Sequence, residues 1–305
     1  MCVAALIRLL PGCTRIVADQ IQKWIFANQL CFDAVLIRVS LCLSAANTPK
    51  FLVKSMLFKR AADLCYDSLL ALVYPQSCAV CGDSVESRAL GVACEKCWHQ
   101  THLFNGTETL CWKCGLPSRG TVPQEKREQV RCGRCDEDGF SAARAGGIYE
   151  GALRASVLVL KREQHIAGRL KQLMIQTQKQ YPLSEATRIV PVPLHPEREK
   201  ARGFNQAALI ARELSEATSL PLDEVSLVRT HHSNRHRAGM DWKGRRDTVA
   251  DAFQVIYPAL IAGERVLLVD DVFTTGATVS SCAKTLLDAG AVEVFVLTLA
   301  RPVRY

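Results

Sequence analysis

Residues 266–278 read Val-Leu-Leu-Val-Asp-Asp-Val-Phe-Thr-Thr-Gly-Ala-Thr: an apolar run, two acids and a threonine-rich turn. The apolar run predicts a buried strand over residues 265–269, and helical spacing of apolar residues predicts a helix over residues 278–289. In sheets built from strand–helix units, ligands bind beyond the carboxyl ends of the strands. Asp270 and Asp271 stand at that end, so we expect a ligand site there.

The turn after the two acids has the chemistry of a phosphate site. Backbone N–H groups and the positive dipole end of the helix attract a dianion. Gly276 allows the backbone to come close to it, and the threonine hydroxyls add donors. Asp270 and Asp271 would repel a phosphate, but they suit ribose hydroxyls or a bridging metal ion. A capped turn with an acidic edge is the simpler alternative for the Asp-Asp pair alone.

The complete string resembles the signature with which type I phosphoribosyltransferases bind phosphoribosyl pyrophosphate (PRPP). The resemblance implies that Asp270 and Asp271 are catalytic and that Mg²⁺ accompanies the diphosphate. The PRPP-binding residues that it implies are Asp270, Asp271, Thr274, Thr275, Gly276, Ala277 and Thr278. Because the sequence indicates no general base, the acceptor of the phosphoribosyl group stays open.

The alternation of strands and helices extends on both sides of this loop. Further strands are expected over residues 145–149, 188–192 and 292–299, and helices over 151–161, 163–180 and 205–218. Such alternation predicts an α/β fold with a mostly parallel sheet and helices on both faces. The resemblance implies that this domain, residues 140–305, is of the type I phosphoribosyltransferase kind.

Eight of the 14 cysteines form four Cys-x-x-Cys pairs. Two such pairs supply the four thiolates of a tetrahedral zinc site, and a site with four protein ligands is structural. The simplest pairing predicts two zinc sites, one at Cys78, Cys81, Cys94 and Cys97 and the other at Cys111, Cys114, Cys132 and Cys135. Interleaved pairing stays open, and a redox dithiol is the rival interpretation.

The net charge, the cysteine spacing and the lengths of the apolar runs bear on the ligands and the cellular compartment of the protein. A net charge of +8 is compatible with anionic ligands or nucleic acid and identifies neither. Metal-type cysteine spacing indicates a reducing, cytoplasmic compartment. No apolar run reaches the length of about 18 residues that a membrane helix needs, so we expect no stable membrane span.

Other blocks carry a closer resemblance. They are Ile148-Tyr149-Glu150-Gly151 with Arg154 and Lys161, then Pro191-Val192-Pro193-Leu194-His195-Pro196 with Arg198 and Arg202-Gly203-Phe204-Asn205-Gln206, and finally Leu297-Thr298-Leu299-Ala300-Arg301. Together with the cysteine region, from Met56 to Arg301, they resemble the ComF family of competence-associated proteins. The resemblance implies a double zinc ribbon before a phosphoribosyltransferase-like domain, and a link to uptake of transforming DNA.

Three basic residues join the PRPP-binding candidates, because cations form charge-assisted bonds to phosphate oxygens. They are Arg198, Arg202 and Lys161. A solvated basic helix start is the alternative for the two arginines. Lys161 ends an expected helix, where a cation also favours the helix dipole.

The chain divides into residues 1–55, without a motif, residues 56–138, a helix with the double zinc ribbon, and residues 140–305. We expect the first segment to reflect an upstream start chosen in error, with a membrane-associated or partner-binding extension as the alternative.

Residues 229–246 hold six cations and one acid. They predict a basic hood over the diphosphate, a nucleic-acid contact strip or a solvated loop.

The sequence thus predicts a PRPP-dependent phosphoribosyltransferase linked to DNA uptake. One alternative is a competence factor that handles nucleic acid and binds phosphoribosyl groups without turnover. Others are a nucleotide-salvage phosphoribosyltransferase and a PRPP sensor. The expected partners are PRPP or another phosphoribosyl-containing ligand, single-stranded DNA and the competence machinery.

Overall fold

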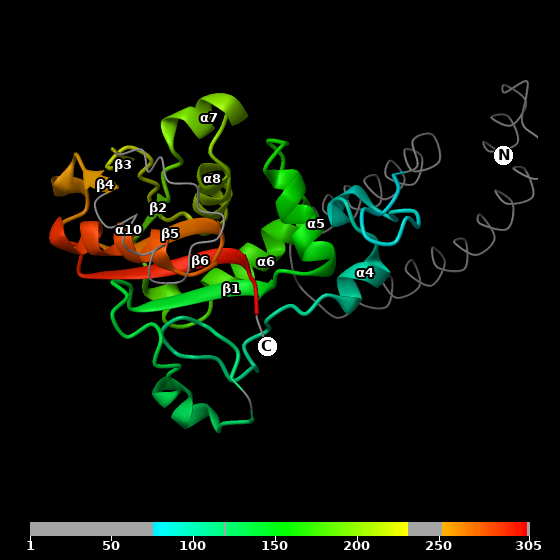
Figure 1. Ribbon diagram of the computed structural model, residues 1–305, viewed down its shortest axis with the longest axis horizontal. Helices are drawn as coiled ribbons and strands as arrows, with labels where there is room; N and C mark the ends of the chain where they lie inside the picture. The colour runs from blue at the N-terminus through cyan, green and yellow to red at the C-terminus, as the bar shows by residue number, and fades with distance from the viewer. Residues whose placement is uncertain (1–75, 119, 231–251, 304–305) are drawn as a thin grey trace, which may run out of the picture. The chain divides into compact units, whose positions relative to one another are not determined.

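The computed structural model describes residues 76–118, 120–230 and 252–303 (Figure 1). The chain divides into two units, Met1–Ala62 and Asp63–Tyr305, and all described residues belong to the second. The expectations for residues 1–55, and for nearly all of the basic segment 229–246, lie outside the described residues. Among the helices that are described, none combines the length and apolar character needed to cross a bilayer.

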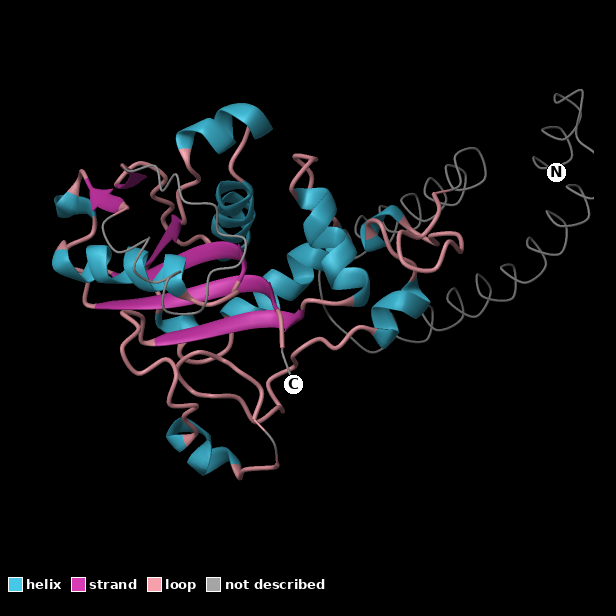
Figure 2. Ribbon diagram, viewed as in Figure 1, coloured by secondary structure: helices cyan, strands magenta, loops and turns pink. Residues whose placement is uncertain are grey.

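A four-stranded parallel sheet forms the centre of this unit (Figure 2). Its strand order is β1–β6–β5–β2, where β1 is Ala142–Ile148, β6 is Glu293–Arg301, β5 is Arg265–Val272 and β2 is Arg188–Pro191. The central strand β5 pairs through Leu268 with Val296 of β6 on one side and with Val190 of β2 on the other. The strand that carries the two acids is therefore an inner strand of the sheet.

Side chains alternate between the two faces, as the pleat of a strand requires. Leu267 and Val269 belong to a buried cluster with α5 (Gly151–Leu160), α6 (Gly168–Gln178) and α8 (Gln206–Thr218). Val266 and Leu268 face the other way, into a cluster with α10 (Ala277–Asp288). The expected α/β fold, a parallel sheet with helices on both faces, is confirmed.

The predicted bounds differ from the observed ones where local signals are weak. Helix α6 begins at Gly168 rather than at residue 163, because the chain turns after α5: the N–H groups of Arg162 and Glu163 donate back to the carbonyl of Val159 at 2.8 and 2.9 Å. Strand β1 begins three residues earlier than expected, at Ala142. Its first residues are alanines and arginine, which have weak strand preference.

Several short elements were not predicted. Helix α7 (Pro196–Arg202) follows β2, and the His195 side chain caps it by accepting from the N–H of Glu197 at 3.1 Å. The three-residue strands β3 and β4 form an antiparallel pair, which is too short for a periodic signal. The remaining elements are α4 (Glu95–Gln100), β3 (Leu227–Arg229), β4 (Phe253–Val255), and the 3-10 turns η2 (Arg88–Leu90), η3 (Gln124–Gln129), η4 (Leu183–Glu185) and η5 (Pro258–Leu260).

The cysteine region covers the outer edge of β1. The N–H of Phe104 donates to the carbonyl of Gly146 at 2.8 Å, and the N–H of Ala143 donates to the carbonyl of Lys113 at 2.6 Å. A Cβ at Gly147 would lie 2.6 Å from the carbonyl oxygen of His102, so this close approach requires glycine. The edge strand is thereby protected from pairing with another chain.

Candidate phosphate loop and metal sites

The loop between β5 and α10 is a tight turn that leads directly into a helix N-terminus. Gly276 precedes α10 in the left-handed conformation, with φ 80°. A Cβ at Gly276 would lie 2.8 Å from Cζ of Phe273, so both the backbone angle and the space require glycine. Thr274 is exposed, whereas Thr275 and Thr278 are half-buried. The turn thus presents hydroxyls beside a helix N-terminus, the arrangement that suits a dianion.

The two carboxylates at the end of β5 have different surroundings. Asp271 is buried, and its Oδ2 lies 3.1 Å from Nζ of Lys161, the C-cap residue of α5. Asp270 is partly exposed, and its Oδ1 accepts from the N–H of Asp271 at 2.8 Å. Loss of hydration around its carboxyl group, and the adjacent charge of Asp271, raise the pKa of Asp270 well above its usual range. A cation at Asp270 would relieve both effects.

Of the three basic residues predicted to bind PRPP, only Lys161 contacts the acidic pair among the contacts that the structure describes. Lys161 is brought to the acidic pair, where it neutralises Asp271. Arg202 donates to the side-chain oxygen of Gln206, and Arg198 is exposed on α7. Helix α7 leaves the carboxyl end of β2, the neighbour of β5, so its residues belong to the same edge of the sheet as the loop. A phosphate contact by Arg198, Arg202 or Lys161 stays a prediction.

The eight paired cysteines gather into two clusters. The first cluster is Cys78, Cys81, Cys94 and Cys97, the second cluster is Cys111, Cys114, Cys132 and Cys135, and within each the sulfurs lie within 4.8 Å of one another. Neighbouring sulfurs are 3.5 to 3.7 Å apart. A zinc ion with bonds of about 2.3 Å to four sulfurs would place them about 3.8 Å apart. Both clusters therefore fit structural zinc sites. Each cluster is made of two Cys-x-x-Cys pairs that follow one another in the chain, so the pairing is not interleaved.

The surroundings of the sulfurs also favour a cation. In the second cluster, the bond with the Cys114 thiol lowers the pKa of Cys111 to about 4, while burial raises the pKa of Cys135 to about 12, so burial works against a further thiolate unless a cation compensates its charge. In the first cluster, the N–H groups of Val80 and Cys94 point at the sulfur of Cys78, 3.4 and 3.3 Å away. Crowded sulfurs with backbone donors around them are the environment of a bound metal.

Two buried arginines flank the second cluster, and neither is among the site residues predicted from the sequence. Arg144 of β1 donates to the carbonyl of Trp112 at 2.7 Å, and Arg301 of β6 donates to the carbonyl of Cys114. Burial lowers the pKa of Arg144 to about 10, so its guanidinium remains charged at neutral pH. An arginine inside an otherwise apolar strand is the sequence feature that indicates such a residue, because a buried charge needs a partner.

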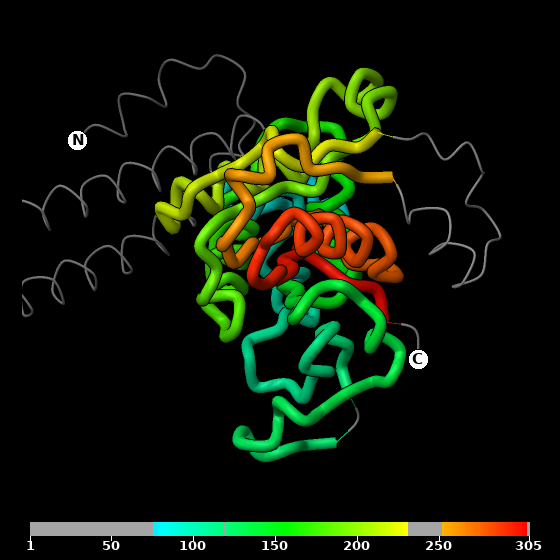
Figure 3. The backbone as a smooth tube through the Cα atoms, turned by 90° about the vertical axis from the view of Figure 1, so that its left-hand side faces the viewer, coloured from blue at the N-terminus to red at the C-terminus, as the bar shows by residue number. Residues whose placement is uncertain are grey.

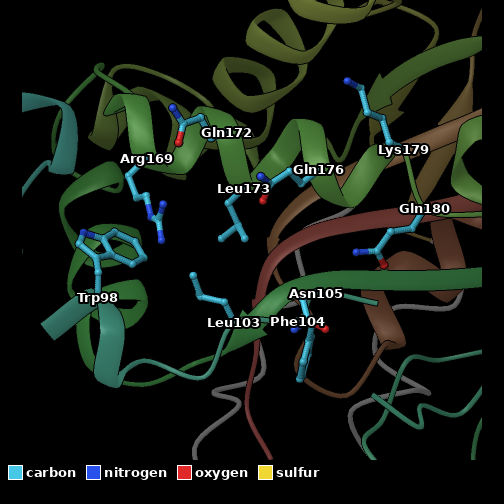
Figure 4. Close-up of a pocket in the computed structure, with 10 residues that line it drawn as sticks. All are labelled: Trp98, Leu103, Phe104, Asn105, Arg169, Gln172, Leu173, Gln176, Lys179 and Gln180. Atoms are coloured by element: carbon cyan, nitrogen blue, oxygen red, sulfur yellow. The ribbon is translucent and has the colours of Figure 1, made fainter. Parts of the chain in front are cut away.

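A separate hollow of about 520 Å³ lies between α6 and residues 98–105 (Figure 4). Its floor is apolar, with Leu103 and Leu173, and Arg169 stacks over the Trp98 ring at 5.9 Å. Its rim is polar, with two cations, Arg169 and Lys179, and no acid in the lining. The other polar residues that line it are Asn105, Gln172, Gln176 and Gln180. No local sequence pattern indicates this hollow, because its lining joins segments that are far apart in the chain.

Comparison with known proteins agrees with this arrangement. Residues 69–136 match the double zinc ribbon domain family. The chain is 31% identical over 202 residues to the DNA utilization protein YhgH of Escherichia coli O157:H7, covering 64% of this chain and 85% of that protein. It is 38% identical over 114 residues to competence protein F of Haemophilus influenzae, covering 37% of this chain and 49% of that protein.

Among solved structures, the chain is similar to the glutamine PRPP amidotransferase of B. subtilis complexed with ADP and GMP. The identity is 22% and the TM-score 0.28, over 48% of this chain and 26% of that one. The chain thus spans about a quarter of that enzyme's length.

Proposed function

The chain belongs to the ComF family of competence-associated proteins, and we propose a ligand for its phosphate loop on that basis. Residues 270–278 bind PRPP, or the phosphoribosyl group of another ligand, with Mg²⁺. The observation that carries the proposal is the order of parts at the carboxyl end of β5: an acidic pair, a left-handed glycine and a helix N-terminus. We also propose residues 56–138 and 140–305 as the two domains, and a reducing cytoplasm as the setting, because the paired cysteines gather into metal-type clusters that need reduced sulfurs.

In this proposal each part has its own task. The N-terminus of α10 and the three threonines hold the 5′-phosphate. Asp270 would hold the ribose hydroxyls or a Mg²⁺ ion, which would supply positive charge for the diphosphate, while Lys161 holds Asp271 in place at 3.1 Å. Phosphoribosyl transfer would break the bond from the anomeric carbon to pyrophosphate and form one to the acceptor. The protein's contribution is to bind the sugar and stabilise the leaving charge, to which Arg198 and Arg202 can contribute.

Calorimetric titration of PRPP with and without Mg²⁺ tests binding directly. Asp270→Asn is expected to weaken binding by about tenfold or more and to remove its Mg²⁺ dependence. Asp288→Asn is the matched control, because it makes the same charge change at the exposed far end of α10. Equal affinities for the wild type and the Asp270→Asn protein would mean that this loop does not hold PRPP.

Turnover is a separate question and has a separate assay. Pyrophosphate release from PRPP, measured with nucleobases, amines and single-stranded DNA as acceptors, is expected with one of these classes. Release that is equal with and without every acceptor would count against a transferase. PRPP binding without any release would instead support a binding protein or sensor.

A second candidate function is the handling of nucleic acid, because the Escherichia coli relative is a DNA utilization protein. The hollow beside α6 favours it, because Arg169 and Lys179 can meet phosphates and the glutamine amides can meet base edges. Lys179→Gln is expected to weaken binding of single-stranded DNA and to reduce its salt dependence. Lys126→Gln, an exposed lysine on η3, is the control, and equal losses in both variants would exclude the hollow.

A further inference from the structure

The carboxyl end of β6, the red strand beside α10 in Figure 3, contacts both the second cluster and the residue that opens the phosphate loop. Arg301, its last residue, is 5% exposed and donates through Nη1 to the carbonyl of Cys114. The Arg301 Cζ atom also lies 5.0 Å above the centre of the Phe273 ring. One buried side chain therefore touches a cysteine knuckle and the first residue after β5.

Phe273 in turn forms the floor of the phosphate loop. Its N–H donates to the carbonyl of Ala300 at 2.9 Å, so its backbone is tied to β6. Its ring packs edge-on against Phe140 at 5.8 Å, and its Cζ is the atom nearest to the space above Gly276. A shift of the Phe273 ring would therefore move directly into the turn that receives the phosphate.

A second connection runs through the chain that leaves the cluster. The N–H of Asp138 donates to the carbonyl of Cys135 at 3.1 Å, and the N–H of Gly139 donates to Oγ of Ser280 in α10 at 3.2 Å. A Cβ at Gly139 would lie 2.9 Å from the backbone nitrogen of Lys284, so this segment presses against α10. The segment thus ties the fourth cysteine of the cluster to the helix that begins at the loop.

Charge explains why an arginine occupies this place. Four thiolates and one Zn²⁺ carry a net charge of about −2, which is costly to bury without compensation. Arg144 and Arg301 are buried cations beside the cluster, and both come from strands of the sheet. The geometry of Arg301 differs from that of Arg144 in one respect: Arg301 also contacts the phosphate loop through Phe273, whereas the aromatic ring beneath Arg144 is that of Trp112, 5.0 Å away.

We infer that Arg301 is a positioning residue that transmits the state of the second zinc site to the phosphate loop, so that loss of that zinc disorders the loop. Zinc would draw the thiolates together and hold the Cys114 carbonyl that Arg301 binds. Arg301 would then hold the Phe273 ring below Gly276. The inference rests on the proposed function only where it concerns PRPP affinity.

The test compares Arg301→Met with Arg144→Met in the full, zinc-loaded chain. Amide hydrogen exchange over residues 273–280, without any ligand, is expected to become about tenfold faster in Arg301→Met and to change less than about twofold in Arg144→Met. Zinc content per chain, measured in both, separates a loop effect from loss of the metal. Arg301→Lys is expected to rescue little, because an ammonium lacks the planar fork that spans a carbonyl and a ring.

Equal exchange in the two methionine variants, or no change in either, would overturn the inference. If Arg301→Met also loses zinc or fails to fold, Phe273→Leu replaces it, since that variant leaves the cluster untouched and removes the ring. PRPP titration is run in parallel as a second readout, with a loss of about tenfold expected for Arg301→Met. A wild type that does not bind PRPP would refute the proposed function, while the exchange result would still decide the coupling.

Discussion

The two cysteine clusters share their ligand chemistry but differ in how they join the rest of the protein. The first cluster packs by apolar contact: Cys94, Cys97 and Trp98 belong to the core formed with α5 and α6. The second cluster packs on the face that α10 covers and is flanked by two arginines from β1 and β6. The same kind of metal site therefore serves once as a support for helices and once as a part of the sheet.

Each cluster also reaches the acidic pair or its loop by a different route. From the first cluster, Thr101 accepts from the N–H of Ala152 at 2.9 Å and so fixes the start of α5, whose far end carries Lys161. Lys161 then pairs with Asp271. From the second cluster, the route is the shorter one through Arg301 and Phe273. We therefore expect the second cluster to control the phosphate loop more strongly than the first.

The largest expected effect is loss of a zinc ligand, Cys132→Ser in the second cluster against Cys81→Ser in the first. Both cysteines are the more accessible members of their clusters, so the two changes are matched. Each should remove one zinc per chain, and stability should fall by on the order of 5 kcal/mol because metal binding contributes to folding. Only Cys132→Ser should speed hydrogen exchange in the phosphate loop. Equal exchange there in both variants would erase the distinction between the clusters.

Gly276→Ala should have the next largest effect. The left-handed backbone costs about 1–2 kcal/mol for a residue with a Cβ, and contact with Phe273 at 2.8 Å adds strain. We expect a destabilisation of about 2–3 kcal/mol by thermal unfolding, with loss of PRPP binding. Gly263→Ala is the matched control, because Gly263 has φ 81° but no neighbour within 4 Å of its Cβ position. If both variants lose the same stability, the Phe273 contact is unimportant.

Asp270→Asn should separate stability from binding. Because the folded pKa of Asp270 is raised above the unfolded one, the folded state binds more protons in the window between them, and stability falls as pH rises through that window. At pH values above this window, and without Mg²⁺ or PRPP, the Asp270→Asn protein should be more stable than the wild type by about 1 kcal/mol. Removing a charged residue from a functional site commonly stabilises the fold by such an amount. At low pH the two should unfold alike. A series of melting temperatures against pH would show this, and a variant less stable at every pH would contradict it.

The smallest effect is expected for Lys161→Met, which tests the route from the first cluster. The Asp271 side chain is only 10% exposed, but that of Lys161 is 33% exposed, so solvent at the lysine end weakens the pair and the loss should be about 0.5–1 kcal/mol. PRPP affinity should fall a few-fold, by less than in Arg301→Met. Lys126→Met, an exposed lysine on η3, is the control in the same titration. A loss in Lys161→Met larger than in Arg301→Met would reverse the proposed order of the two routes.

Local signals explain which parts of the fold were predictable. The helices α5, α8 and α10 were predicted to within one or two residues, because their apolar residues recur at helical spacing. Strand β5 was predicted at its start, but it continues through the two acids to Val272. Carboxylates within a strand give no apolar signal, so the end of the strand was placed too early.

The site was predictable only in its linear parts. Regular cysteine spacing indicated the zinc ligands, and the string of residues 266–278 indicated the loop. The contacts of Arg301 with Cys114 and Phe273 join residues far apart in the chain, and no pattern in one segment reveals them. The ion pair of Lys161 with Asp271 and the hollow beside α6 were missed for the same reason.

Hydrogen exchange of the zinc-loaded protein with and without PRPP and Mg²⁺ is the most direct test of the phosphate loop, because it shows where the ligand binds. We expect new protection over residues 273–279, absent in Asp270→Asn and retained in Asp288→Asn. Protection confined to residues 169–180, or none anywhere with PRPP in excess, would contradict the assignment of the phosphate loop.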